Sequence, residues 1–100
     1  MDRLVLVARL KPGAREQARE LIAAKPEPRA IEATFDRQGI FLAENEAVFF
    51  FEGEDAGESV RAILNDPVRS TAIGPWLPLF DGQLHAAREA YFWEQERKTA

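Results

Sequence analysis

The N-terminal quarter of the chain changes from a strand-like pattern of apolar residues to a helical one. Residues 3–10, RLVLVARL, are rich in Val and Leu and end at the turn signal Lys11-Pro12-Gly13, which predicts a strand. Residues 14–25, AREQARELIAAK, have the period of an amphipathic helix that ends before Pro26. The apolar face of this helix carries Ala14, Ala18, Leu21 and Ile22.

Two apolar runs in the middle of the chain predict a β-hairpin. The runs are GIFLA, residues 39–43, and AVFFF, residues 47–51, and the short polar turn Glu44-Asn45-Glu46 separates them. The preceding residues 26–38 contain two prolines and show no clean period, so they are interpreted mostly as a connection.

A second amphipathic helix is predicted after the hairpin. Asp55 and Glu58 match a capping box, in which each side chain accepts a hydrogen bond from a backbone N–H at the start of the helix. The helix is expected to stop at Asn65-Asp66-Pro67. Its apolar face carries Ala56, Val60, Ile63 and Leu64. This spacing repeats that of the first helix, so the chain is interpreted as two copies of a strand-helix-strand unit.

The last predicted strand is EAYFWEQ, residues 89–95. It completes the order β-α-β-β-α-β, which predicts an α+β, ferredoxin-like sandwich with an antiparallel sheet. The long connection before it is unusually apolar: residues 68–73 predict a short helix, whereas Gly74-Pro75 and Pro78 are expected to prevent regular structure. Its large side chains predict a lid or a packing arm; they are Trp76, Leu77, Leu79 and Phe80.

The strand pattern places apolar side chains on both faces of this sheet. AVFFF directs Phe49 and Phe51 to one face and Val48 and Phe50 to the other. Right-handed crossovers put both helices on the same face. Because an exposed aromatic side chain forgoes about 1.5–3 kcal/mol of burial, the second face needs a cover, and the apolar connection is expected to supply only part of it. The sequence therefore predicts a homodimer with open face packed on open face, about a two-fold axis.

Composition agrees with one globular domain over residues 1–100, since 46% of the residues are hydrophobic and 30% are charged. The formal net charge is -4, and the basic residues are spread among acidic ones, so neither a nucleic acid nor a membrane surface is an expected partner. There is no cysteine, which removes disulfides and thiolate metal sites. The apolar run at residues 4–8 is too short for a signal sequence or a membrane span, and a cytoplasmic location is expected.

This layout, with an apolar second face and the final segment AYFWE, resembles the dimeric α+β barrel superfamily. That group includes antibiotic-biosynthesis monooxygenases, heme-degrading oxygenases, muconolactone isomerase, rhamnose mutarotase and stress-responsive barrel proteins. LKPG (10–13), VFFFEGEDA (48–56), PWLPLFDG (75–82) and EAYFWE (89–94) are similar to segments of small uncharacterised bacterial proteins of that fold. The resemblance covers nearly the whole chain and implies the fold and the dimer, but one fold hosts many functions.

The resemblance also implies the position of a pocket, and it allows two known activities of the superfamily to be compared with the residues of this chain. In enzymes of the superfamily the pocket lies between the sheet and the two helices. Heme-degrading members use a histidine on the second helix, and residues 55–65 contain none. Rhamnose mutarotases use a histidine and a tyrosine on the first helix, and residues 14–25 contain neither. These two activities are therefore not expected.

Few residues in the chain are candidates for chemistry. His85 is the only histidine, and it could act as a general base at a pocket mouth or be a solvated loop residue. Tyr91 is the other candidate for proton transfer. Arg9 could anchor an anion, or form an ion pair at the rim of the sheet. The aromatic side chains of Trp76, Phe80 and Trp93 could stack on a flat ligand or serve as core and interface anchors.

The sequence is compatible with three functions. The first is a small homodimeric protein that binds an apolar or aromatic small molecule. The second is a cofactor-independent monooxygenase or isomerase that uses Tyr91 or His85 in a pocket closed by the Trp76 connection. The third is a structural or interaction module. No metal and no cofactor are predicted, because the sequence lacks phosphate-binding, dinucleotide-binding and metal-binding motifs.

Overall fold

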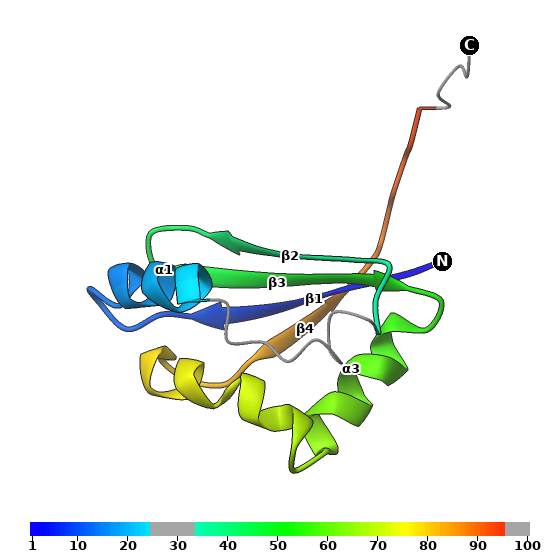
Figure 1. The fold of residues 1–100 in the computed structure, drawn as a ribbon. Coiled ribbons are helices and arrows are strands. Elements are labelled where there is room, and N and C mark those ends of the chain that lie inside the picture. The colour runs from blue at the N-terminus through cyan, green and yellow to red at the C-terminus, as the bar shows by residue number, and fades with distance from the viewer. Residues whose placement is uncertain (25–33, 96–100) are drawn as a thin grey trace.

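Strands from both halves of the chain form one antiparallel sheet, and helices cover one of its faces (Figure 1). The structure is a computed structural model that describes residues 1–24 and 34–95. The strands are β1 (Asp2–Arg9), β2 (Arg37–Leu42), β3 (Glu46–Gly53) and β4 (His85–Arg88). The helical segments are α1 (Arg15–Ala24), α3 (Ala56–Asn65) and the 3-10 helices η1 (Arg69–Ala72) and η2 (Gly74–Leu79).

The sheet has the order β2-β3-β1-β4, which confirms the predicted ferredoxin-like α+β fold. The predicted hairpin is confirmed, and Ile40 of β2 lies opposite Phe49 of β3. The turn after β1 is also confirmed, because Gly13 has a φ of 80°, a conformation that glycine adopts without strain. Lys25 of the predicted first helix, residues 26–33 of the predicted connection and the tail at residues 96–100 lie outside the described residues.

The core lies between the sheet and the helices. Alternate residues of β1 and β3 supply its sheet side, with Leu6 opposite Phe49 in the register of the two strands. Small residues on the helices allow close packing, and Ala18 is fully buried. The helical side of the core consists of Ala14, Ala18, Ala56, Val60 and Ile63. The predicted apolar faces of the helices therefore supply this side of the core, except that Leu21 and Ile22 are only partly buried and Leu64 is 41% exposed.

The connection after α3 packs on the helical face. Trp76, Leu79 and Phe80 are buried there, and the rings of Trp76 and Phe49 meet edge to face with centroids 5.1 Å apart. The prediction that this connection covers part of the open face is wrong. Backbone hydrogen bonds fix its place beyond the end of β1, from Lys11 N to Leu79 O (2.8 Å) and from Asp81 N to Arg9 O (2.7 Å).

The prediction that Gly74-Pro75 and Pro78 prevent regular structure is also wrong. Gly74–Leu79 forms the 3-10 helix η2, with Pro75 in its first turn and Pro78 inside it. The first N–H groups of a helix have no partner within the helix, so Pro75 loses no bond there. Pro78 has no N–H to donate, so the segment keeps its helical path without a backbone hydrogen bond from that position.

The last strand is displaced from its predicted position. β4 comprises His85–Arg88, whereas the sequence predicted residues 89–95, and this prediction is wrong. β4 pairs with β1 so that His85 lies opposite Val7 and Arg88 opposite Leu4. In this register β1 has no residue left to pair beyond residue 90. Residues 91–95 therefore have no partner in β1, and residues 89–95, which we call the C-terminal arm, extend away from the sheet (Figure 1).

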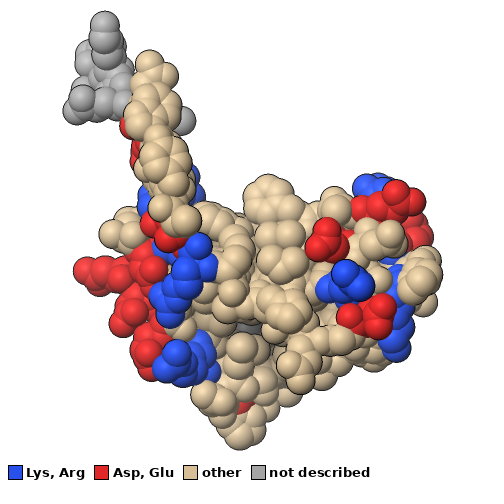
Figure 2. Space-filling view, turned by 180° about the vertical axis from the view of Figure 1, so that it is seen from behind, with Lys and Arg blue, Asp and Glu red and all other residues tan. Residues whose placement is uncertain are grey.

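The face of the sheet turned away from the helices is apolar at its centre, and we call it the open face. Its apolar side chains are Val5, Val7, Phe41, Val48 and Phe50. Phe41 is 61% exposed. The view from behind shows uncharged surface in the middle of the molecule, with acidic and basic groups gathered toward either end (Figure 2). Among the residues that the structure describes, no helix has the length and apolarity of a membrane span.

Candidate functional site

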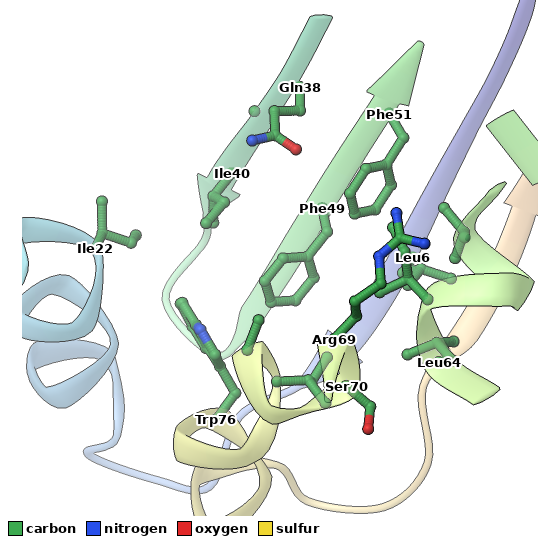
Figure 3. A pocket seen from close by; sticks show the side chains of 15 residues that line it. Leu6, Ile22, Gln38, Ile40, Phe49, Phe51, Leu64, Arg69, Ser70 and Trp76 are labelled. Atoms are coloured by element: carbon green, nitrogen blue, oxygen red, sulfur yellow. The ribbon is translucent and has the colours of Figure 1, made fainter. Parts of the chain in front are cut away.

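A pocket of about 310 Å³ lies between the sheet and the helical layer (Figure 3). This volume falls at the lower end of the range of about 300–1,000 Å³ that is usual for small-molecule sites. The strands β1, β2 and β3 form its floor. The floor residues are Leu6, Gln38, Gly39, Ile40, Phe49 and Phe51. The phenyl rings of Phe49 and Phe51 point into this space because alternate residues of β3 face the helices.

The walls of the pocket come from four helical segments. Ile22 of α1 and Trp76 of η2 lie toward the same side of the pocket (Figure 3). The lining residues from α3 are Val60, Ile63 and Leu64. The 3-10 helix η1 and the residue after it add Arg69, Ser70, Ala72 and Ile73. Most of this lining is hydrocarbon or aromatic, so the pocket favours an apolar body over a polar one.

The polar side chains of the lining come from Gln38, Arg69 and Ser70. Gln38 lies opposite Phe51 in the pairing of β2 with β3, so its amide is at the Phe51 end of the pocket. Arg69 belongs to the same end. Its Nη2 donates to Thr34 Oγ1 at 2.9 Å, and the next residue, Phe35, packs its ring on Phe51 with centroids 4.8 Å apart. The pocket is therefore apolar toward Trp76 and polar toward Phe51.

Asp66 holds the segment from which Arg69 projects. Its carboxylate Oδ1 accepts hydrogen bonds from the backbone N–H groups of Val68 (2.8 Å) and Arg69 (3.2 Å). The backbone hydrogen bond from Arg69, followed by that from Val68, lowers the pKa of the Asp66 carboxyl below its ordinary value. The carboxylate thus stays ionised and fixes the start of η1, which orients the Arg69 side chain toward the sheet.

Among the side chains predicted as ligand-binding, Trp76 is the one that lines the pocket. Phe80 is buried behind it, with ring centroids 6.3 Å apart, and supports its position. Trp93 lies on the C-terminal arm and is 67% exposed, and Tyr91 is exposed on the same arm. Arg9 and His85 are exposed at one end of the open face, on neighbouring strands. The structure therefore does not bring the two candidate proton-transfer residues into the pocket.

Sequence reasoning missed Arg69, Ser70 and Gln38 as pocket residues. Gln38 fell in a stretch interpreted as a connection, although β2 begins at Arg37. Arg69 fell in the predicted short helix, where a charged residue is ordinarily solvated. No local signal in the sequence distinguishes Arg69 from a solvated cation, because its placement depends on Thr34 and on the strands of the sheet.

Glu52 is a buried carboxylate on the open face, and two arginine side chains compensate its charge. Glu52 Oε2 accepts from Arg3 Nε at 2.6 Å, and Oε1 accepts from Arg37 Nε at 2.7 Å. The hydrogen bond from Arg37, reinforced by that from Arg3, lowers the pKa of Glu52 although burial opposes the shift. Each oxygen of the carboxylate thus has one arginine donor, and the group joins β1, β2 and β3. In the described part of the chain, no group of three or more His, Asp or Glu side chains could hold a metal ion.

The fold is shared with several solved structures of low sequence identity. The structure is similar to tetracenomycin F2 cyclase from Streptomyces glaucescens, a type-II polyketide cyclase, with a TM-score of 0.72 and 15% identity over 96% of this chain and 100% of that chain. It is similar to a nipsnap family protein of unknown function from Agrobacterium tumefaciens, with a TM-score of 0.64 and 19% identity over 93% of this chain and 91% of that chain.

An antibiotic biosynthesis monooxygenase has a TM-score of 0.62 and 13% identity over 92% of this chain and 99% of that chain. No protein-family model and no curated protein matches the chain. At these identities the likeness establishes the fold and leaves function to the residues of the site. It confirms, at the level of the fold, the resemblance to the α+β barrel group that the sequence suggested.

Proposed function

We propose that this protein binds an apolar or aromatic small molecule in the pocket between its sheet and its helices. The single observation that carries the proposal is the pocket itself, a cavity of about 310 Å³ lined by Phe49, Phe51, Trp76 and aliphatic side chains. Protein interiors are ordinarily close-packed, whereas the apolar side chains that line this partly open pocket lack contacts on one side. A ligand that fills the space restores the missing contacts.

Tryptophan fluorescence tests the proposal because the two tryptophans have different surroundings: Trp76 is buried at the pocket, and Trp93 is exposed on the C-terminal arm. The variant Trp93→Phe leaves Trp76 as the only tryptophan, so its emission reports on the pocket. We expect saturable changes in this emission with neutral apolar ligands that do not absorb where tryptophan is excited, such as alkylcyclohexanols. If no ligand of such a panel changes the Trp76 emission, the proposal is contradicted.

A matched pair of variants on η1 identifies the binding site. Ala72 lines the pocket, whereas its neighbour Thr71 is exposed and does not. Ala72→Phe in the Trp93→Phe protein fills the cavity and should abolish the fluorescence response. Thr71→Phe adds the same ring outside the pocket and should leave the response intact. Equal responses in the two variants would place the ligand elsewhere.

We further propose that the protein is a homodimer that pairs open face on open face. Two observations support this: the apolar centre of the open face, and the C-terminal arm, whose Tyr91, Phe92 and Trp93 are exposed. The Arg3 side chain holds the start of the arm, because its Nη1 lies 3.1 Å from Glu89 Oε1 and its Cζ lies 3.5 Å from the centroid of the Phe92 ring. A second copy of the chain would cover both surfaces at once.

The second candidate function is a cofactor-independent monooxygenase or isomerase acting on an aromatic substrate. The fold shared with a polyketide cyclase and with an antibiotic biosynthesis monooxygenase favours it, and the cavity it requires is present. The placement of His85 and Tyr91 outside the lining speaks against those two residues as its proton-transfer groups. Binding without chemistry therefore accounts for more of the site, and the interaction-module alternative leaves the pocket unexplained.

A further inference from the structure

The pocket contains one cation, Arg69, whose hydrogen-bonding capacity is not used up by the described protein. The Nε of Arg69 is buried and has no hydrogen-bond partner among residues 1–24 and 34–95. A buried N–H group without a partner costs about 1–3 kcal/mol, and more when the group is charged. Native structures rarely retain such a group, and an ordered water, an ion or a ligand beyond the described residues ordinarily satisfies it.

The protein holds the Arg69 residue in place through its side chain and through its backbone. Nη2 donates to Thr34 Oγ1 at 2.9 Å, and Asp66 fixes the backbone through the Arg69 N–H at 3.2 Å. The charge of Asp66 interacts with that of Arg69, but the two form no ion pair, and none of the ion pairs found among the described residues includes Arg69. Asp66 already uses one carboxylate oxygen for two backbone N–H groups. The Arg69 side chain is thus preorganised with an unused donor.

The direction of the side chain places this donor inside the pocket. Figure 3 shows Arg69 extending from η1 toward the sheet, with its guanidinium beside Phe51 and Leu6. The Gln38 amide belongs to the same end, and Trp76 lies at the opposite, apolar end. A ligand that spans the pocket therefore meets hydrocarbon and aromatic surface along its body and a fixed cation at one terminus.

We propose that the ligand of this pocket is an apolar or aromatic monocarboxylate, whose carboxylate accepts a hydrogen bond from Arg69 Nε. This inference rests on the proposed binding function and names the class of molecule that the site selects. A carboxylate fits because its two oxygens match the planar fork of a guanidinium, and charge-assisted bonds of this kind are among the strongest that proteins make. The apolar lining selects the remainder of the molecule by burial.

The test compares an acid with its neutral ester on the unmodified chain, using isothermal titration calorimetry. The probes are 2-naphthoate and methyl 2-naphthoate, which share the ring system and differ in charge. We expect the acid to bind about 10- to 100-fold more tightly than the ester, the range that a hydrogen bond to a charged group provides. Equal affinity for the two probes would overturn the inference and leave the proposed apolar binding intact.

Variants then assign the difference to Arg69. Arg69→Met keeps the length of the side chain and should remove the preference for the acid while leaving ester binding within about threefold. Arg69→Lys retains the charge without the fork and should keep part of the preference. Arg61→Met is the control, because Arg61 is exposed on α3 and does not line the pocket. A preference that persists in Arg69→Met would overturn the assignment, and no binding of either probe would overturn the proposed function itself.

Discussion

The carboxylate of Asp2, at the first position of β1, accepts a hydrogen bond of 2.9 Å from the backbone N–H of Gly57 in the first turn of α3. Asp2 lies opposite Gly53 in the sheet, and the chain turns from Gly53 into α3 within a few residues. The strand therefore delivers an acidic side chain to the positive end of the helix. The predicted capping box is wrong, because Asp55 at the N-cap position makes no side-chain hydrogen bond.

Replacing Asp2 should therefore destabilise the fold, whereas replacing Asp55 should not. We expect Asp2→Ala to lower the free energy of unfolding by about 1 kcal/mol, the usual value of a helix cap. Asp55→Ala is the matched control and should change it by less than about 0.5 kcal/mol. Urea unfolding followed by circular dichroism measures both. A larger loss in Asp55→Ala than in Asp2→Ala would restore the capping box and contradict the structure.

The ion group around Glu52 predicts a dependence of stability on pH. Glu52 is 2% exposed and bridges Arg3 and Arg37, and its folded-state pKa lies below the ordinary value of 4.5. Such a group stabilises the fold fully above the unfolded pKa and loses this contribution as the pH falls through the folded pKa. We expect Glu52→Gln to cost about 2 kcal/mol at neutral pH. Arg37 is the larger cause of the lowered pKa, but its side chain is 64% exposed and solvent screens it, so Arg3, 17% exposed, supplies the larger share of this stability.

Urea unfolding at a series of pH values measures this contribution. The difference in unfolding free energy between the unmodified chain and Glu52→Gln should be constant at neutral pH and should shrink as the pH is lowered below about 4.5. Glu58→Gln is the control, since Glu58 forms only an exposed pair with Arg61 at 3.8 Å, and it should cost less than about 0.5 kcal/mol. A difference that grows on acidification would contradict the assigned ion group.

These cases show what the sequence could predict and what it could not. The apolar periodicity identified both helices, the hairpin and the core faces, because burial of alternate or helically spaced residues leaves a local pattern. The position of β4 was not predicted, since the register is set by the docking of residues 79–81 beside Arg9 and Lys11, which are remote in sequence. The aromatic run at residues 91–93 looked like a buried strand but extends beyond the last residue of its partner strand.

The same distinction applies to the site. Trp76 could be predicted as a pocket residue because a large aromatic side chain in a proline-rich connection needs a place to be buried. Arg69 could not be, because its role depends on Thr34 and Phe51, which come from separate parts of the chain. A cation in a single sequence carries no sign of whether its side chain meets water or a cavity. That information resides in the tertiary packing.

The proposed dimer predicts that a charge on the open face prevents association. Phe41 is 61% exposed on this face, and Leu77 is 57% exposed on η2, on the helical side of the sheet. Phe41→Lys would bury an unpaired ammonium in the interface and should weaken the dimer at least about 100-fold. Leu77→Lys introduces the same charge outside the interface and should leave the dimer unchanged. Sedimentation velocity over a concentration series measures both.

Two outcomes would count against this arrangement. If the unmodified chain sediments as a monomer at high concentration, the open face has no second copy to cover it. If Leu77→Lys dissociates the protein and Phe41→Lys does not, the interface lies on the helical side of the sheet.

The last prediction concerns the C-terminal arm. The emission of Trp93 distinguishes a dimer whose interface includes the arm from a dimer that leaves the arm in water. The variant Trp76→Phe retains Trp93 as the only tryptophan, and circular dichroism checks that the variant is folded. In one copy of the chain Trp93 is 67% exposed, so its emission should be that of a solvated indole when the protein is dilute. Burial against a second copy should shift the emission to shorter wavelength as the concentration rises, in step with the mass measured by sedimentation. A dimer that forms with no change in Trp93 emission would show that the sheets pair without the arms.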